Sequence, residues 1–329
     1  MTTVPTVPTN RSGAGIGFIL VGIFSISLND MMIKQLSGGY PLHQIVFVRS
    51  GIGILFSLIL VQVEGGWSIL KTKQPSLHML RGILIVLSNM TYFVALAAIP
   101  LADATALFFA APLFITLLSI PILGEKVGSL RITAVLVGFS GVIIMQRPWE
   151  GTETLMASRI VLLLPVLSAV TYALNQVLTR KLGVTTKASA LAVYIQAMFV
   201  VVSSLFWLIA GDGQFAEGVN NPSIEFLLRA WIWPSDGDLW IMLGLGFNSA
   251  IVGYCLSQAY RMADAATVAP FEYAGLPLAV FWGWFLWADF PVWEVWMGMG
   301  LIMGSGIFVF VRERQKARRL ASAEVNRRY

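Results

Sequence analysis

Ten long runs of apolar residues follow one another along the chain, separated by short polar segments. A helix of about 20 apolar residues is what is needed to cross a membrane core about 30 Å thick. The runs that meet or approach this length are 15–34, 42–63, 78–99, 102–123, 130–146, 158–181, 188–210, 239–261, 264–287 and 293–311. Of the 329 residues, 57% are apolar and 12% are charged, so a soluble fold could not bury the hydrocarbon. The sequence therefore predicts an integral membrane protein.

The pattern inside these runs favours helices over a membrane β-barrel. A barrel strand would need about 10 residues in strict alternation of apolar and polar side chains. The runs 52–63 and 161–167 do not alternate. We therefore expect an all-α integral membrane protein with ten transmembrane helices.

Several other classes are excluded by composition. A single cysteine, Cys255, rules out a disulfide scaffold. The net charge of +5 comes from basic residues spread between apolar runs, which does not predict nucleic-acid binding. We expect a small-molecule substrate and membrane lipid as partners, no cofactor, and either a monomer or a homodimer.

The distribution of Lys and Arg predicts the orientation in the membrane. Of the 22 basic residues, 17 fall on the side of the two termini, four on the other side, and Arg49 inside a span. Basic residues favour the cytoplasmic side of a membrane. Both termini are therefore expected on the cytoplasmic side of a bacterial inner membrane. The basic tail 312–329 is then a topology anchor near anionic lipid or, alternatively, a partner-binding segment.

The two halves of the chain resemble each other. Leu28-Asn29 recurs as Leu174-Asn175, and Pro112-Leu113 recurs as Pro277-Leu278, in the same order. The predicted organisation is a disordered cytoplasmic tail 1–14, a first five-helix repeat 15–146, a linker 147–157, a second five-helix repeat 158–311 containing the extracytoplasmic loop 211–238, and the tail 312–329.

Five spans per repeat is an odd number, so the second copy must be inserted upside down. Inverted repeats are the usual construction of secondary transporters, in which the substrate site lies where the halves meet. The alternative is a gene duplication that only builds a stable bundle. The sequence favours a transporter that works by alternating access.

Two ionisable residues lie level in the first two predicted spans. Asp30 is about six residues before the end of the first span, and Arg49 about seven after the start of the second. With a rise of about 1.5 Å per residue, both lie roughly 9–10 Å below the outer surface. They are predicted to form either a structural ion pair or part of an outer gate or site.

Glu272 lies about eight residues into the ninth predicted span, and no basic residue occurs between positions 264 and 294. Its neighbours Phe271 and Tyr273 are aromatic. A carboxylate at this depth could bind a cationic group of the substrate, aided by cation–π attraction, or carry a coupling proton. The structural alternative is a neutral acid that is hydrogen-bonded to another helix.

Uncharged polar residues recur three or four positions apart in four spans, and therefore share one helix face in each. These faces are predicted to line a polar cavity, or alternatively to join helices to one another. They are Asn29 with Ser25, Asn89 with Tyr92, Asn175 with Thr171, and Tyr254 with Gln258.

The chain resembles the drug/metabolite transporter superfamily, of the EamA type, from Gly15 to Val311. The residues that carry the resemblance are Ser27-Leu28-Asn29-Asp30 with Lys34, Phe47-Val48-Arg49, Leu80-Arg81-Gly82, Ala111-Pro112-Leu113-Phe114 followed by Gly124-Glu125, and Ala269-Pro270-Phe271-Glu272-Tyr273. The nearest pattern is the bacterial S-adenosylmethionine uptake type.

The resemblance implies a central cavity lined by spans 1, 3, 4, 6, 8 and 9. It also implies a small polar metabolite as substrate: an amine, an amino-acid-derived or nucleoside-like compound, a riboflavin-like vitamin or an exported amino acid. A membrane-embedded enzyme and a receptor or scaffold are the alternative classes. The two histidines, His43 and His78, do not form a metal or acyl-transfer motif, which disfavours the enzyme.

Overall fold

The apolar runs form long α-helices in the computed structural model, which describes residues 12–72, 74–124, 128–147, 149, 159–182, 186–218, 220–262 and 271–326. The predicted tail 1–14 and linker 147–157 fall mostly outside these described residues. The helices are α1 (Ser12–Leu36), α2 (Leu42–Glu64), α3 (Pro75–Leu96), α4 (Leu101–Phe108), α5 (Ala111–Leu123), α6 (Ser129–Met145), α7 (Arg159–Leu182), α8 (Ala188–Ala210), α9 (Pro222–Leu228), α10 (Asp236–Met262), α12 (Gly275–Trp287) and α13 (Trp293–Asn326), with a 3₁₀ turn at Trp67–Leu70.

Within the described residues, seven stretches are long and apolar enough to cross a membrane. They are Gly13–Leu36, Leu42–Glu64, Pro75–Leu96, Leu101–Ile122, Arg159–Leu178, Ala188–Ala210 and Asp236–Leu256. They coincide with seven of the ten predicted spans, and α6, α12 and α13 occupy the other three. The chain is therefore an all-helical, multi-pass membrane protein. The count of ten spans in two inverted repeats stays a prediction.

Two predicted spans are interrupted near a proline. The fourth is divided into α4 and α5 by a turn at Phe109-Ala110. Pro112 has no N–H for a bond to the carbonyl of Phe108, and its ring crowds that carbonyl. In the same way, Pro277 has no N–H to donate to the carbonyl of Tyr273, and a turn at 273–274 precedes α12. The interruptions bring backbone turns to the interior of the bundle.

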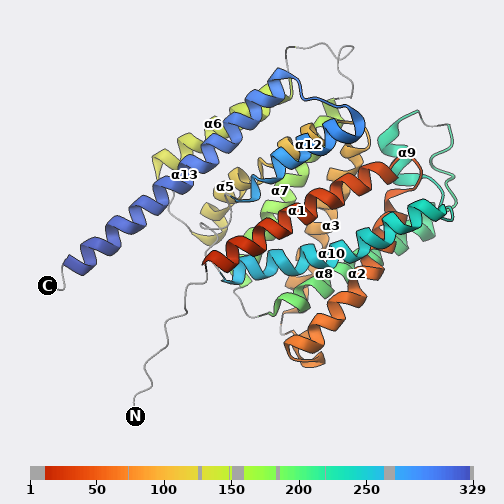
Figure 1. Ribbon diagram of the computed structural model, residues 1–329, viewed down its shortest axis with the longest axis horizontal. Coiled ribbons are helices and arrows are strands. Elements are labelled where there is room, and N and C mark those ends of the chain that lie inside the picture. The colour runs from red at the N-terminus through yellow and green to blue at the C-terminus, as the bar shows by residue number, and fades with distance from the viewer. Residues whose placement is uncertain are drawn as a thin grey trace.

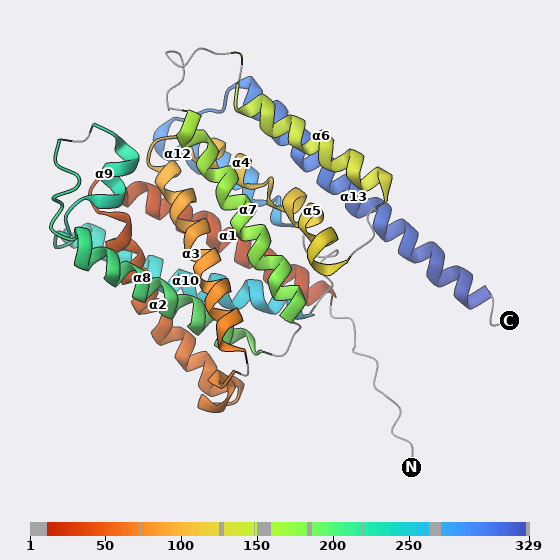
Figure 2. The same cartoon turned by 180° about the vertical axis from the view of Figure 1, so that it is seen from behind.

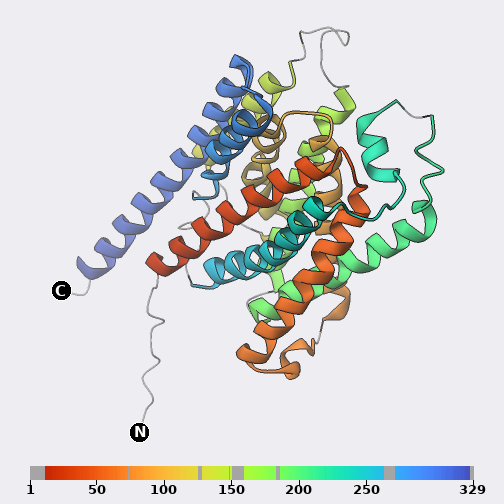
Figure 3. The ribbon, with the colours of Figure 1, turned by 45° about the vertical axis from the view of Figure 1, so that its right-hand side comes forward.

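Helices from the two halves of the sequence pack side by side. The most extensive contacts pair α1 with α10, α2 with α8, α3 with α7 and α6 with α13. Figure 3 shows α1, in red, lying along α10, in cyan. Each of these pairs joins a helix from the first half of the chain to one from the second half.

The α6–α13 pair forms one flank of the bundle, and α13 continues past its neighbours at the end that also holds the start of α1 (Figures 1 and 2). The last helix therefore extends beyond Val311, where the sequence placed the end of the span. Glycine permits the close crossing of the pair, because a Cβ at Gly141 would lie 2.9 Å from the Gly298 carbonyl oxygen. The end of the bundle that holds the start of α1 and the protruding part of α13 is called the terminal end.

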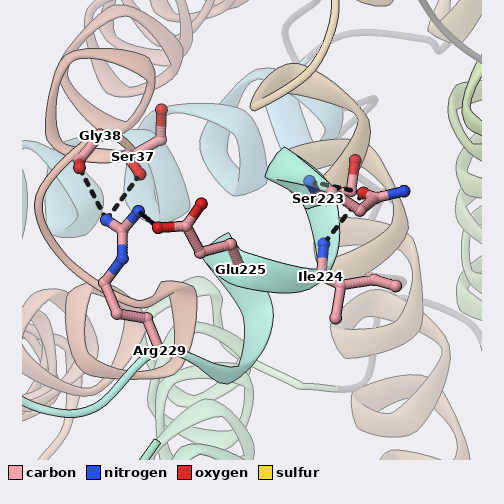
Figure 4. Close-up of polar contacts among 7 residues, drawn as sticks. Ser37, Gly38, Ser223, Ile224, Glu225 and Arg229 are labelled. Atoms are coloured by element: carbon pink, nitrogen blue, oxygen red, sulfur yellow. Dashed lines mark hydrogen bonds and ion pairs between the residues drawn. The ribbon is translucent and has the colours of Figure 1, made fainter. Parts of the chain in front are cut away.

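The opposite end of the bundle, called the α9 end, carries the short helix α9 (Figure 1), whose polar contacts Figure 4 shows. Asn221 caps α9 by accepting hydrogen bonds from the backbone N–H groups of Ser223 and Ile224, at 3.0 and 3.3 Å. Arg229 pairs with Glu225 at 2.6 Å and donates to the carbonyl of Gly38 at 2.7 Å. These contacts attach part of the predicted loop 211–238 to the turn between α1 and α2.

Candidate functional site

A cavity of about 270 Å³ lies in the middle of the bundle. Its walls come from α1, α3, α4, α7, α8, α10 and α12, with Arg49 contributed by α2. Among the residues singled out from the sequence, six line it: Asn29, Asp30, Arg49, Asn89, Tyr92 and Glu272. Residues from both halves of the chain thus meet around one chamber.

Asp30 and Tyr92 form a buried polar contact in the cavity wall. The Tyr92 hydroxyl donates to Oδ2 of Asp30 at 3.1 Å and lies 2.9 Å from Oγ1 of Thr105. This contact connects α1, α3 and α4. It supplies the Asp30 carboxylate with one protein donor.

Arg49 lies on the same cavity but does not pair with Asp30. Its guanidinium carbon is 5.7 Å from the ring centre of Phe93 and 5.2 Å from that of Phe199. No ion pair or hydrogen bond connects Arg49 to Asp30, both of which are described residues. The predicted structural ion pair is therefore not formed in this structure, and two aromatic rings flank the cation instead.

A second group of polar contacts joins α1 to α10. Asn248 donates to Oδ1 of Asn29 at 3.1 Å and to the carbonyl of Ser25 at 2.7 Å. The Nδ2 group of Asn29 is 3.5 Å from the hydroxyl of Ser249. Because both of its amide atoms contact α10, Asn29 joins two helices as well as lining the cavity.

The remaining members of the predicted polar faces differ in their surroundings. Asn89 donates to the carbonyl of Ile85, one turn earlier on α3, at 3.0 Å. Asn175 is buried on α7 and does not line the cavity.

Tyr254 and Gln258 lie towards the terminal end, away from the cavity lining. Gln258 donates to the Tyr254 hydroxyl at 2.9 Å and to Oε1 of Glu64 at 3.2 Å. The other oxygen of Glu64 accepts from the hydroxyl and the backbone N–H of Ser189, at 2.7 and 3.3 Å. Glu64 therefore connects the end of α2 to the start of α8 and to α10. The sequence did not indicate this cluster, since Glu64 falls at the edge of a span.

Glu272 and its two aromatic neighbours point in different directions. Glu272 lines the cavity and interacts electrostatically with Tyr172 and Tyr273. Phe271 packs against the small apolar group formed by Ile19, Ile23 and Ala259. Phe271 and Glu272 are helical and differ by about 100° in direction, whereas Tyr273 lies in the turn that precedes α12.

Tyr273 does not itself line the cavity, but it packs behind one of the rings that do. Its ring centre lies 5.6 Å from that of Phe109, and its hydroxyl is buried without a hydrogen-bond partner among the described residues. Its ring and hydroxyl occupy the space that a Cβ at Gly306 would need. Only glycine at position 306 leaves room for this tyrosine.

Aromatic side chains form much of the cavity wall, and sequence reasoning had singled out only Tyr92 among them. The centres of Tyr92 and Phe108 are 5.5 Å apart, and those of Phe108 and Tyr172 are 5.3 Å apart. These spacings are typical of interacting aromatic pairs. The other rings in the wall are Phe93, Phe109 and Phe199.

The sequence reasoning also missed small hydroxyl and amide groups on the cavity. They are Ser27, Ser88, Thr105, Ser168, Gln196 and Ser249. Gln196 could have been recognised as a polar residue deep in an apolar run. Serine and threonine give no such signal, because they are common in membrane helices.

Comparison with known proteins identifies the family. The EamA-like transporter family matches residues 13–147. A riboflavin transporter of Vibrio cholerae is 30% identical over 298 residues, covering 90% of this chain and 92% of that protein. One of Rhizobium johnstonii is 29% identical over 322 residues, covering 97% and 98%. An S-adenosylmethionine uptake transporter of Rickettsia felis is 26% identical over 301 residues, covering 92% and 94%.

These relatives are transporters rather than enzymes, and they match nearly the whole chain. A multi-pass helical bundle with a central cavity that several helices share is a common architecture of solute transporters. The chain belongs to the EamA-like transporter family of the drug/metabolite transporter superfamily.

Proposed function

We propose that this transporter carries a flat, heteroaromatic metabolite across the bacterial cytoplasmic membrane by alternating access, with riboflavin as the first candidate. The observation that carries the proposal is the aromatic wall of the cavity. Three helices contribute the adjoining rings of Tyr92, Phe108 and Tyr172. Ring faces bind planar ligands by stacking and exclude water from the contact.

The polar groups of the same cavity complement such a ligand. The wall carries hydroxyls and amides, including Ser88, Asn89 and Gln196, beside the carboxyl groups of Asp30 and Glu272. A flat ring system stacked on the aromatic side chains would leave its hydroxyl-bearing substituents beside these groups. Riboflavin, which relatives from two organisms transport, combines both features.

The packing of the helices supports two inverted five-helix repeats around this cavity. In two equivalent five-helix repeats, α1 of the first half corresponds to α7 of the second half, and α3 corresponds to α10. The counterpart of the α1–α10 contact is therefore the α7–α3 contact, and both are among the four most extensive in the bundle. The other two extensive pairs, α2–α8 and α6–α13, each join a helix to its own counterpart. This is the pattern that a pseudo-twofold axis between two repeats produces. Alternating access would then move one repeat against the other.

The orientation rests on the charges of the loops. By their position in the sequence, most of the Lys and Arg residues belong to the side of the two termini, and acidic residues such as Glu225 and Asp238 belong to the opposite side. The positive-inside rule favours termini in the cytoplasm.

Uptake of riboflavin by vesicles containing the purified protein tests the proposal. We expect time-dependent accumulation of riboflavin that empty vesicles do not show, and competition by other flavins. Flux of a small aliphatic amino acid without flux of riboflavin would contradict the proposed substrate class.

A cationic, nucleoside-like metabolite such as S-adenosylmethionine is the second candidate, because Glu272 places a carboxyl group on the cavity. If Glu272 binds a cationic group, Glu272→Gln should weaken S-adenosylmethionine binding at least tenfold and leave riboflavin binding within twofold. If it carries a coupling proton instead, the variant should bind either solute normally and lose the pH-gradient dependence of transport. Equal binding and equal transport by the variant would exclude both roles.

A further inference from the structure

Arg49 is a buried cation that faces the cavity. Its exposed fraction is 5%, and it lies about one third of the way along α2. The rings of Phe93 on α3 and Phe199 on α8 lie within 6 Å of its guanidinium carbon. Both rings also line the cavity. The guanidinium is therefore held between two aromatic side chains on the cavity wall.

The hydrogen-bond donors of Arg49 are unused within the described part of the chain. Its Nε is enclosed without an acceptor, and no hydrogen bond or ion pair connects its terminal nitrogens to a described residue. Asp30 is the carboxylate that interacts with it electrostatically, but Oδ2 of Asp30 accepts from Tyr92. Cation–π contacts stabilise the charge and leave the N–H groups unsatisfied.

A buried cation with unsatisfied donors is costly unless a partner arrives. In a membrane helix such a group marks a functional site by default. The planar guanidinium presents donors in a fork that matches two oxygen atoms of a carboxylate, or of adjacent carbonyl and ring acceptors. The cavity is where a ligand of that kind would reach it.

We propose that Arg49 is a substrate-binding subsite, which donates hydrogen bonds to the oxygen-bearing edge of the substrate while the rings of Phe93 and Phe199 lie beside the guanidinium. The proposal rests on the proposed function for the identity of the substrate. Both candidate substrates carry such an edge: the pyrimidine carbonyls of riboflavin and the carboxylate of S-adenosylmethionine. Arg49 thus acts as a specificity residue rather than as half of an ion pair with Asp30.

The test compares three probes on the purified full-length protein, using the quenching of tryptophan fluorescence. Riboflavin has a flat tricyclic ring and an acceptor edge, phenazine has a flat tricyclic ring without carbonyls, and benzoate carries a carboxylate on a single ring. Arg49→Gln should weaken riboflavin binding by about ten- to one-hundred-fold, the loss of a charge-assisted hydrogen bond, and leave phenazine binding within twofold.

Arg81→Gln is the matched control. Arg81 is also a buried arginine, 7% exposed, with an unpartnered Nε, but it does not line the cavity. This variant should bind all three probes as the unmodified protein does. If Arg49→Gln does not fold, Arg49→Lys supplies the test, since it keeps the charge but removes the fork. It should still weaken riboflavin binding about tenfold.

The outcomes separate this inference from the proposed function. Unchanged riboflavin binding by the Arg49 variant overturns the subsite, and so does an equal loss of phenazine binding. Benzoate binding that requires Arg49, in a protein that binds neither tricyclic probe, supports the subsite and overturns the proposed substrate class. A protein that binds none of the three probes contradicts both proposals.

Discussion

Ser88 on α3 and Ser168 on α7 exchange hydrogen bonds across the helix pair. The Ser88 hydroxyl donates to the carbonyl of Ser168 at 3.0 Å, and the Ser168 hydroxyl donates to the carbonyl of Ser88 at 2.7 Å. Both side chains are almost fully buried and line the cavity. Small residues permit this close approach of two backbones. The exchange connects the first half of the chain to the second beside the cavity.

We expect this serine pair to act as one unit. Ser88→Ala and Ser168→Ala should each lower the free energy of unfolding by about 0.5–1.5 kcal/mol, the range of interhelical hydrogen bonds in membranes. The double variant should lose less than the sum, because each single change already breaks the exchange. Chemical unfolding in detergent micelles measures all three variants. Ser204→Ala is the control, since the Ser204 hydroxyl bonds to Val200 within α8. Strict additivity would show that the two serines are independent.

The membrane class and much of the cavity could be predicted from the sequence, for one physical reason. An ionisable or amide group is costly in hydrocarbon, so Asp30, Arg49 and Glu272 had to face the interior of a bundle. The structure brings these three residues to one cavity. What the sequence could not supply was the distance between them. The depths of Asp30 and Arg49 predicted either an ion pair or part of an outer gate or site, whereas in the structure Asp30 contacts Tyr92 and Arg49 contacts two phenylalanines.

Other features of the site could not be predicted from the spacing of residues along the sequence. Tyr273 was grouped with Glu272 because the two are adjacent, but a turn precedes α12 and Tyr273 packs against Phe109. Gln258 shares a helix face with Tyr254, as predicted, but that face meets Glu64 near the terminal end. The aromatic wall was missed because a phenylalanine that lines a cavity looks the same in sequence as one that contacts lipid.

The Tyr273 hydroxyl is predicted to be dispensable. It is buried without a hydrogen-bond partner, so Tyr273→Phe removes an unsatisfied polar group and keeps the ring that packs on Phe109. We expect the free energy of unfolding to stay the same or to rise by up to about 1 kcal/mol. Thermal unfolding and riboflavin binding both measure this variant. A tenfold loss of affinity would return Tyr273 to the substrate site.

Glu64 is predicted to stabilise the terminal end without contacting substrate. Its carboxylate accepts from Ser189 at the start of α8 and from Gln258. Glu64→Ala should lower the free energy of unfolding by about 1–2 kcal/mol, because a helix N-terminus loses its acceptor. Glu64→Gln retains an acceptor oxygen and should lose less. Thermal unfolding of both variants checks the order, and a changed binding constant for riboflavin would contradict a purely structural role.

Phe108 is predicted to be the central stacking residue of the cavity. It is the ring that contacts both Tyr92 and Tyr172, so removing it opens the aromatic wall from α3 to α7. Phe108→Ala should weaken riboflavin binding by about tenfold, as expected for losing one ring contact of 1–1.5 kcal/mol. Tyr172→Phe keeps a ring and should bind riboflavin with an affinity within twofold of the unmodified protein.

Phe114→Ala is the control for the loss of an aromatic residue, since Phe114 packs on Phe139 and does not line the cavity. It should reduce stability while leaving the affinity unchanged. If the Phe108 and Phe114 variants bind riboflavin equally well, stacking in this cavity does not select the substrate.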